Sequence, residues 1–264
     1  MKLRSKETYW LLKNGIINSY PSLQQDISCD VLIVGGGITG ALMAFQLSSE
    51  GYKTVLIDKR DVSFGSTSAT TSMLQYELDE KLFSLIDKVG ENAAVESYQE
   101  GVRAILKLSR IVKLLQIDCD FEMKNSLYVA RSSDDAEELA QEFECRKVFG
   151  FDVRWLSDQQ LREEFGVSGT GGILSEVGAS LDVYRLACLL LNYCVTRHGM
   201  EIYDHTSLEK VETENDRNFI MTEHAVITCS SVVYATGYET QSFLKDNIVD
   251  LNSTYALISE PLLH

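Results

Sequence analysis

The fold of this chain is decided by Val31-Leu32-Ile33-Val34-Gly35-Gly36-Gly37-Ile38-Thr39-Gly40. A buried strand runs into a glycine-rich turn, and a helical stretch then extends to Gly51. A second buried strand, residues 54–57, ends at the acidic residue Asp58. This order of elements predicts the βαβ unit that binds dinucleotides, and therefore an α/β fold with a parallel sheet.

Each glycine of the turn has a separate physical task. Gly35 makes the tight turn, Gly37 lets the backbone approach a pyrophosphate, and Gly40 lets the helix sit close on the sheet. The pyrophosphate would lie at the helix N-terminus, beside Ile38 and Thr39, because unpaired N–H groups and the helix dipole favour anions there. The turn therefore predicts where the cofactor phosphates bind.

Asp58 lies eighteen residues after Gly40, at the end of the second strand. In that place a carboxylate can accept hydrogen bonds from a ribose diol. The same carboxylate would repel a 2′-phosphate, although Arg60 nearby partly offsets this repulsion. A cofactor without a 2′-phosphate is therefore favoured.

The composition bounds the class of protein. A chain of 264 residues with 45% hydrophobic residues can bury a sizeable core as one or two domains. Its net charge of −15 argues against nucleic-acid and anionic-membrane partners. The N-terminus does not resemble a signal peptide, and the longest apolar run, residues 186–195, is too short to span a bilayer. We therefore expect a cytoplasmic protein without an integral membrane segment.

The cysteine and histidine patterns do not indicate a metal site or a disulfide framework. The six cysteines include no CxxC pair, and the four histidines form no HxxxH or HExxH motif. We expect the thiols to be reduced and to serve as small core residues. No metal site is predicted.

Hydrophobic periodicity and capping residues predict further elements along the chain. The expected helices are 91–116, 134–149, a shorter one opened by the capping box at 157–160, and one from the cap Asp182 to about His198. The expected strands are 126–130, 151–155, 171–174 and 253–258, together with a hairpin between 219 and 237. Residues 62–76 are rich in Gly, Ser and Thr and predict a loop.

Two further motifs consist mainly of small residues: GSTSATTS at Gly65–Ser72 and VVYATG at Val232–Gly237. In the first, small residues let a helix begin against a bound cofactor, and hydroxyl and N–H groups can meet phosphate oxygens. The second is a buried strand whose small final residues permit close backbone approach to a ligand. Each motif alone is weak evidence, because Ser/Thr loops and strands that end in glycine are common.

Taken in this order, the glycine turn with its acid, the GSTS loop and the late VVYATG strand resemble the D-amino-acid-oxidase-like family of FAD-dependent oxidoreductases. That family includes glycine, sarcosine and γ-glutamylputrescine oxidases, and the opening stretches Thr8–Leu11 and Tyr20–Leu23 are most similar to the last branch. Residues 178–186 resemble the segment that leads into the family's second FAD-domain helix. The resemblance spans essentially the whole chain and implies a Rossmann-type FAD-binding domain interleaved with a partial α+β substrate domain.

The resemblance also implies which residues contact FAD. Gly35, Gly37, Ile38, Thr39 and Gly40 would contact the pyrophosphate. Asp58 would bind the adenosine ribose, and Lys59, Arg60 and the backbone near Leu208 would contact the adenine. Ser66, Thr67 and Ser68 would contact phosphate and ribityl groups, and Thr71, Ser72 and Met73 would lie toward the isoalloxazine. Ala235, Thr236 and Gly237 would also lie against the cofactor. No histidine occurs between residues 60 and 77, where some relatives attach FAD, so noncovalent binding is expected.

The family pattern implies domains made of separated segments. The FAD-binding domain would comprise 28–90 and 180–245, and the substrate-side domain 91–179 and 246–264, after a lead-in of residues 1–27. Relatives continue well past the VVYATG strand, whereas His264 is only twenty-seven residues beyond Gly237. We therefore expect an incomplete substrate domain, and weak FAD binding with little turnover for this chain by itself.

The function that the resemblance implies is oxidation of a C–N bond in a small amine or amino acid, by hydride transfer to FAD. No catalytic residue is identified; Gln75, Tyr76 and Glu77 fit equally well as flavin-facing residues or as ordinary structural positions. Two alternatives stay open. One is a truncated or split FAD-binding fragment without catalysis, and the other is an NAD-dependent dehydrogenase, which the βαβ unit alone would permit.

Overall fold

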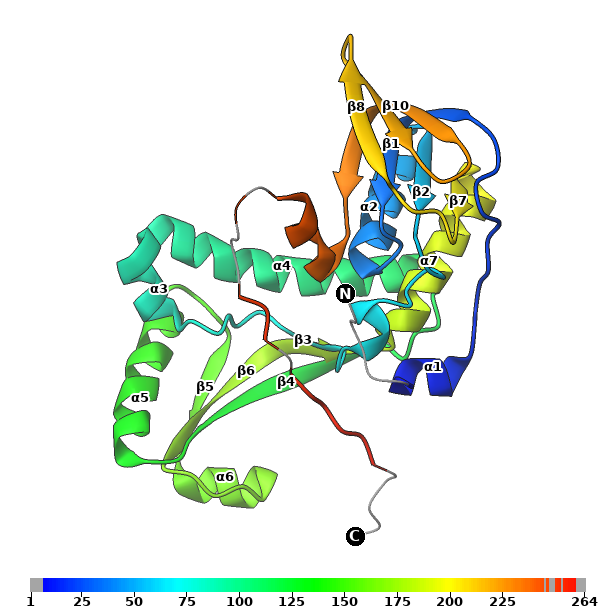
Figure 1. Cartoon of the computed structure of the whole chain (residues 1–264). Helices are drawn as coiled ribbons and strands as arrows, with labels where there is room; N and C mark the ends of the chain where they lie inside the picture. Colours follow the sequence, from blue (N-terminus) through cyan, green and yellow to red (C-terminus); the bar gives the residue numbers. More distant parts are fainter. Residues whose placement is uncertain (1–6, 245, 247–249, 253, 260–264) are drawn as a thin grey trace. The chain divides into compact units, whose positions relative to one another are not determined.

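The computed structural model describes residues 7–244, 246, 250–252 and 254–259 (Figure 1). By their contacts these residues divide into two compact units. The first unit holds the chain up to Thr71 and from Asp182 onward, and the second holds residues 72–181. The second unit is therefore an insertion in the chain of the first, and each unit has a sheet of its own.

The first unit is built on a six-stranded sheet. In spatial order its strands are β7 (Glu201–Tyr203), β2 (Thr54–Ile57), β1 (Ile27–Val34), β10 (Val226–Tyr234), β9 (Arg217–Met221) and β8 (Lys210–Glu214). The first four run parallel, and β9 and β8 continue the sheet antiparallel. The hairpin expected between 219 and 237 is confirmed as β9–β10, and a second hairpin, β8–β9, precedes it.

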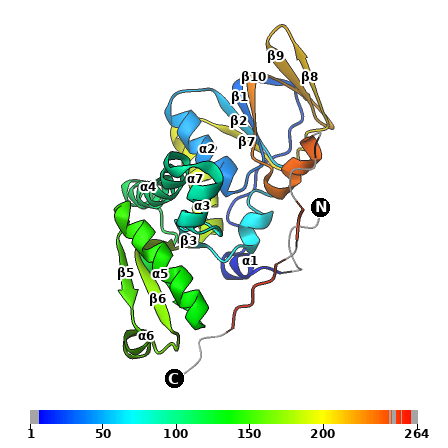
Figure 2. The ribbon, with the colours of Figure 1, turned by 90° about the vertical axis from the view of Figure 1, so that its left-hand side faces the viewer.

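Two helices of the first unit, α2 (Ile38–Ser49) and α7 (Val183–His198), pack against each other (Figure 2). α2 follows the glycine turn and packs on β1 and β2, as a βαβ unit requires. The carboxylate of Asp182 accepts a hydrogen bond from the backbone N–H of Arg185 and caps α7, which ends at Gly199 in the left-handed conformation. The helix expected from 182 to 198 is confirmed, and half of its residues are buried, whereas Asn192 and the last turn are exposed.

The second unit has a smaller, antiparallel sheet. Its strands are β3 (Met73–Gln75), β4 (Glu122–Ala130), β5 (Val153–Leu156) and β6 (Gly171–Ser180), and β6 pairs with each of the other three. Its helices are α3 (Leu82–Val89), α4 (Glu91–Leu115), α5 (Ser133–Val148) and α6 (Asp158–Phe165). The helices expected at 91–116, at 134–149 and after the capping box are confirmed, and α5 packs on the sheet (Figure 2).

The boundaries between the units differ from the expected domain boundaries at 90/91 and 179/180. β3 pairs with β6 and α3 packs on α4, so residues 72–90 belong to the second unit by their contacts. Residues 62–76 are also more ordered than a loop, because they contain a 3-10 helix, η1 (Ser66–Ala69), in addition to β3. The extents of an FAD-binding and a substrate-side domain in the functional sense stay predictions.

The strand expected at 253–258 is wrong for the residues that the structure describes there. Residues 254–259 form neither strand nor helix, and Ser253 lies outside the described residues. Tyr255 is 87% exposed and Leu257 fully exposed. An apolar run becomes a strand only where a neighbouring strand accepts its backbone hydrogen bonds, and the described part of the chain offers this segment no such neighbour.

A buried carboxylate joins two helices in the second unit. Glu142 on α5 is fully buried and accepts hydrogen bonds from the backbone N–H groups of Leu82 and Phe83, at 3.0 and 3.2 Å. These are the first two residues of α3, whose N-terminal N–H groups have no partner within the helix. Arg146, one turn along α5 and 1% exposed, donates to Glu142 at 2.6 Å. The charge of Glu142 is therefore balanced by a helix N-terminus and a guanidinium.

Arg146 also contacts Tyr76 and Glu77, two of the three residues that the sequence analysis named as candidates to face the flavin. Its guanidinium lies 5.8 Å from the ring centre of Tyr76 and donates to Glu77 at 3.4 Å. Tyr76 is buried and stacks on Phe151, at 5.5 Å between ring centres. Tyr76 and Glu77 thus have structural contacts inside the second unit, whereas Gln75 is exposed, and any role of the three toward a flavin stays a prediction.

We expect a large loss of stability when the Arg146 cation is removed from its contacts with Glu142 and Glu77. Arg146→Met leaves the charge of Glu142 buried without its guanidinium, and the free energy of unfolding should fall by about 3–5 kcal/mol. Arg154→Met is the matched control, because Arg154 pairs with Glu164 through two hydrogen bonds while both side chains are well exposed. Solvent screens that pair, so the control should change stability far less. Equal losses in urea unfolding of the two variants would contradict this account.

Candidate cofactor-binding site

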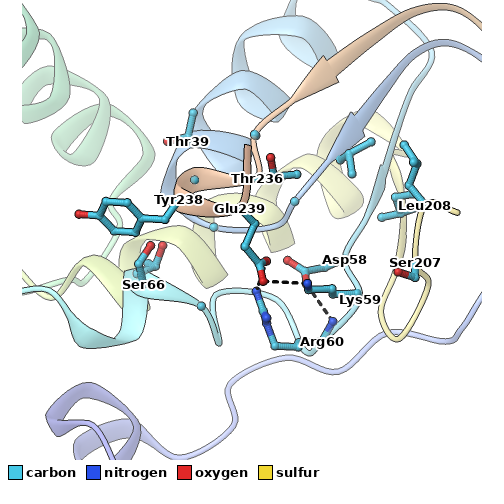
Figure 3. A pocket seen from close by; sticks show the side chains of 18 of the residues that line it. Thr39, Asp58, Lys59, Arg60, Ser66, Ser207, Leu208, Thr236, Tyr238 and Glu239 are labelled. Carbon is cyan, nitrogen blue, oxygen red and sulfur yellow. Dashed lines mark hydrogen bonds and ion pairs between the residues drawn. The ribbon is translucent and has the colours of Figure 1, made fainter. Parts of the chain in front are cut away.

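A cavity of about 510 Å³ opens at the carboxyl ends of β1, β2 and β10 in the first unit (Figure 3). Its volume lies in the range of small-molecule and cofactor sites, and ligands of open α/β sheets bind at this edge. The residues that line it are Val34, Gly35, Gly37, Ile38, Thr39, Ile57, Asp58, Lys59, Arg60, Gly65, Ser66, Thr67, Thr206, Ser207, Leu208, Ala235, Thr236, Gly237, Tyr238, Glu239, Gln241 and Phe243. They come from five separated stretches of the chain.

The glycine turn brings the end of β1 against the end of β10. Gly35 has a φ of +108°, and a Cβ atom there would lie 2.5 Å from the carbonyl oxygen of Ala235. A Cβ atom on Gly40 would lie 1.9 Å from the carbonyl oxygen of Gly35. The backbone N–H of Ala235 in turn donates to the carbonyl of Val34 at 2.8 Å. Side chains at the two glycines would push turn, helix and β10 apart, so the floor of the cavity requires both.

The Thr67 hydroxyl binds the N-terminus of α2. The backbone N–H of Ile38 donates to Oγ1 of Thr67 at 3.0 Å, and Thr67 is buried in η1. Ser66, the neighbouring residue of η1, lines the cavity. The motif GSTS is therefore fastened to the helix N-terminus, where N–H groups and the helix dipole favour an anion.

The Asp58 carboxylate at the end of β2 is held by two backbone donors. Its Oδ2 accepts the N–H of Gly36 at 2.7 Å, and its Oδ1 accepts the N–H of Arg60 at 2.9 Å. Burial raises the pKa of Asp58, while these two hydrogen bonds and the Arg60 charge act in the opposite direction. Each carboxylate oxygen has a further lone pair, so the group can still accept hydroxyl donors from the cavity.

Two cations of the cavity wall share one acid. Oε1 of Glu239 lies 2.8 Å from Nζ of Lys59, and its Oε2 lies 3.0 Å from Nη2 of Arg60 (Figure 3). Glu239 belongs to the 3-10 helix η2 (Gly237–Phe243), which begins at the last residue of the VVYATG motif. Burial acts to raise the pKa of Glu239, but the hydrogen bonds and charges of Lys59 and Arg60 outweigh it and lower that pKa to about 2. The acid is therefore ionised throughout the neutral pH range.

The lead-in before β1 forms hydrogen bonds with two segments at or near the cavity. It contains a short helix, α1 (Tyr9–Asn14), and the indole N–H of Trp10 donates to the carbonyl of Thr70, just after η1, at 2.8 Å. Further along, the backbone N–H of Leu23 donates to Oγ1 of Thr206, a cavity residue, at 3.0 Å. Sequence reasoning treated residues 1–27 only as a polar lead-in and missed this contribution.

Asp204 connects the lead-in to the loop after β2 through buried hydrogen bonds. Its carboxylate is fully buried and accepts the backbone N–H groups of Tyr20 at 2.9 Å and Val62 at 3.0 Å. Burial raises the pKa of Asp204 to about 6, and the nearby carboxylates of Asp61 and Asp58 act in the same direction. No local sequence pattern marks this residue, since its partners lie more than 140 positions away.

The structure brings most of the sequence-predicted site residues to one cavity. Thirteen of the eighteen line the cavity, and the exceptions are Gly40, Ser68, Thr71, Ser72 and Met73. Gly40 lies within the first turn of α2, Ser68 is buried and donates to the carbonyl of Gly65, and Ser72 and Met73 belong to the second unit. Contact of all eighteen residues with a cofactor stays a prediction.

Several cavity residues escaped the sequence analysis. The most consequential lie in two segments: Thr206 and Ser207, beside the predicted Leu208, and Tyr238, Glu239, Gln241 and Phe243. Glu239 is the partner of Lys59 and Arg60, which lie 180 and 179 positions before it. The only local signal was its place two residues after the VVYATG motif.

Comparison with known proteins places this geometry in context. A family model described as FAD dependent oxidoreductase matches residues 30–263. A Bacillus subtilis protein with the provisional name Rieske 2Fe-2S iron-sulfur protein YhfW is 32% identical over 152 residues, which are 58% of this chain and 30% of that protein. Gamma-glutamylputrescine oxidoreductase of Escherichia coli is 23% identical over 201 residues, which are 73% of this chain and 45% of that protein.

A solved structure shares the fold. The crystal structure of glycine oxidase from Geobacillus kaustophilus superposes with a TM-score of 0.67 at 21% identity, over 81% of this chain and 56% of that chain. The chain spans half or less of the length of the two curated relatives above. Among the described residues, no helix is long and apolar enough to cross a membrane.

We expect the contribution of Asp204 to the free energy of unfolding to depend on pH. An aspartate in the unfolded chain has a pKa near 3.9, so between about pH 4 and 6 the folded chain binds more protons at this group. Its contribution to the free energy of unfolding is full below that window and is lost as the pH rises through about 6. Asp204→Asn cannot titrate, so the difference in unfolding free energy, wild type minus variant, should fall from pH 4.5 to 7 in urea titrations. A difference that is constant or rises would refute this assignment.

Proposed function

The chain belongs to the family of FAD dependent oxidoreductases, and on this premise we propose that it binds FAD in the cavity of its first unit and serves the oxidation of a C–N bond in a small amine or amino acid. One observation carries the proposal. The glycine turn, the Asp58 carboxylate, η1 and the end of β10 line a single cavity at the carboxyl edge of the parallel sheet. That arrangement suits a dinucleotide whose phosphates lie at a helix N-terminus.

The donors and acceptors of the cavity fit FAD. The N-terminus of α2 and the hydroxyl of Ser66 would hold the pyrophosphate, because both can donate hydrogen bonds to an anion. The Asp58 carboxylate would accept the ribose hydroxyls, and the apolar side chain of Leu208 would lie near the adenine. The tight approach at Gly35 leaves no room for a side chain where the backbone would meet the cofactor.

Bound FAD supplies a two-electron acceptor for the hydride of a carbon that carries an amine. The residues of this chain contribute binding and orientation: backbone N–H groups hold the phosphates, and Asp58 fixes the ribose. The names of glycine oxidase and of gamma-glutamylputrescine oxidoreductase support an amine or amino acid as the substrate class. Catalysis is a separate proposal from FAD binding, since the chain spans about half the length of such relatives. A cytoplasmic location also stays a prediction.

The experiment that tests this function has two stages. The purified chain is incubated with FAD or with NAD, and the bound cofactor is identified by its absorption after gel filtration. The FAD-loaded chain is then mixed anaerobically with a panel of amines and amino acids, and bleaching of the flavin absorption is followed. Uptake of NAD in place of FAD would support the dehydrogenase alternative. Uptake of FAD without bleaching by any substrate would support a noncatalytic FAD-binding fragment.

Asp58→Ala tests the ribose contact. Loss of a charge-assisted hydrogen bond to a buried hydroxyl costs about 1.5–3 kcal/mol, so the affinity for FAD should fall about ten- to a hundredfold. Asp30→Ala is the matched control, because Asp30 also accepts a backbone N–H, that of Lys53 at 2.8 Å, but is exposed and does not line the cavity. Unchanged FAD affinity in Asp58→Ala would remove this residue from the site.

A further inference from the structure

Glu239 bridges two segments that line the cavity. Glu239 lies in η2, which follows β10, whereas Lys59 and Arg60 follow β2. Each carboxylate oxygen binds a different cation, at 2.8 Å to Lys59 and 3.0 Å to Arg60. Figure 3 shows the Glu239 carboxylate directed at both cations. The bridge therefore links segments that lie about 180 residues apart in the chain.

Other contacts of η2 join residues that are close in the chain. Oγ1 of Thr236 lies 2.9 Å from Oγ1 of Thr240, and the side-chain amide of Gln241 donates to the carbonyl of Asp246 at 2.7 Å. The ring of Phe243 packs on Tyr234 at 5.2 Å between centres. Phe243 thus contacts β10, whereas the two ion pairs of Glu239 connect η2 to the residues that follow β2. These ion pairs are a link between η2 and a segment that is distant in the chain.

The exposures of the three side chains define how the bridge can open. Glu239 is 11% exposed, whereas Lys59 and Arg60 are 43% and 35% exposed. The acid is the less exposed partner, and both cations are in contact with solvent. Salt can screen such pairs because their cations are in contact with water. Loss of both pairs would leave a buried carboxylate uncompensated, which favours the closed arrangement.

We propose that Glu239 is the residue that retains the cofactor: its ion pairs to Lys59 and Arg60 fasten η2 across one end of the cavity, and FAD leaves only when they are broken. The inference rests on FAD occupying this cavity, as proposed above. A second effect of the same charge acts in the opposite direction. Glu239 cancels the positive charge of Lys59 and Arg60, and without it the cavity would attract the FAD phosphates more strongly. The sign of the change in the dissociation rate therefore decides between a fastening and a merely neutralising role.

The test measures release of FAD from Glu239→Gln, which keeps the size of the side chain and removes its charge. The FAD-loaded chain is mixed with an excess of an FAD-scavenging apoprotein, and transfer is followed by flavin fluorescence at low and at moderate salt. Release from the variant at low salt should be about five- to tenfold faster than from the wild type, as for the loss of partly buried charge pairs. Salt should accelerate release from the wild type and have little effect on the variant. Glu212→Gln is the control, because Glu212 pairs with Lys210 at 2.6 Å on β8 and does not line the cavity.

Two further variants keep the inference testable if Glu239→Gln fails to fold. Lys59→Met and Arg60→Met each remove one pair, and each should accelerate release less than the loss of the acid. Equal or slower release from Glu239→Gln, or from both cation variants, would overturn the fastening role while leaving FAD binding intact. A wild-type chain that takes up no FAD would overturn both this inference and the proposed function.

Discussion

The parallel pairing of β1 with β10 is the constraint on which the candidate site depends. Seven residue pairs, from Ile27 with Ile227 to Val34 with Tyr234, join segments about 200 positions apart. The pairing continues one step beyond the strands, because Ala235 donates to the carbonyl of Val34. That step brings Ala235 against Gly35 so closely that a Cβ atom at Gly35 would collide with its carbonyl oxygen. The VVYATG motif and the glycine turn are therefore two halves of one surface.

The insertion of residues 72–181 raises the entropic cost of this pairing, since a long loop must close before β1 and β10 can meet. The insertion has a core of its own. In its sheet β6 pairs with each of the other three strands. The buried Glu142, paired with Arg146 on α5, binds the N-terminus of α3. Other contacts between distant segments also close the first unit. Helix α7 packs on α2, and the lead-in donates hydrogen bonds from Trp10 to Thr70 and from Leu23 to Thr206.

Buried carboxylates recur at the joints of this acidic chain. Glu142 and Asp204, which are fully buried, and Asp58, which is half-buried, each accept two backbone N–H groups. The cost of burying each charge is offset by donors whose positions are fixed by the backbone, so the carboxylate in turn fixes where the donating segments lie. Glu239 differs, because its partners are two side-chain cations within reach of solvent. A joint made of side-chain ions can open and close, which suits a wall of a binding cavity.

The sequence by itself determined the βαβ unit, the capped helices α6 and α7, the long helix α4 and most residues of the cavity floor. Those features depend on interactions within a few turns of one segment, such as the glycine turn at Gly35 or the cap at Asp182, and such interactions leave a readable spacing. Tertiary structure alone decided that β3 and α3 belong to the inserted unit, that the lead-in forms hydrogen bonds with segments at or near the cavity, and that Asp204 and Glu239 face their partners. It also decided that residues 254–259 form no strand, although their composition favours one. The physical reason is the same in each case: a hydrogen bond or ion pair between distant segments depends on where the chain brings them, and no local periodicity records that.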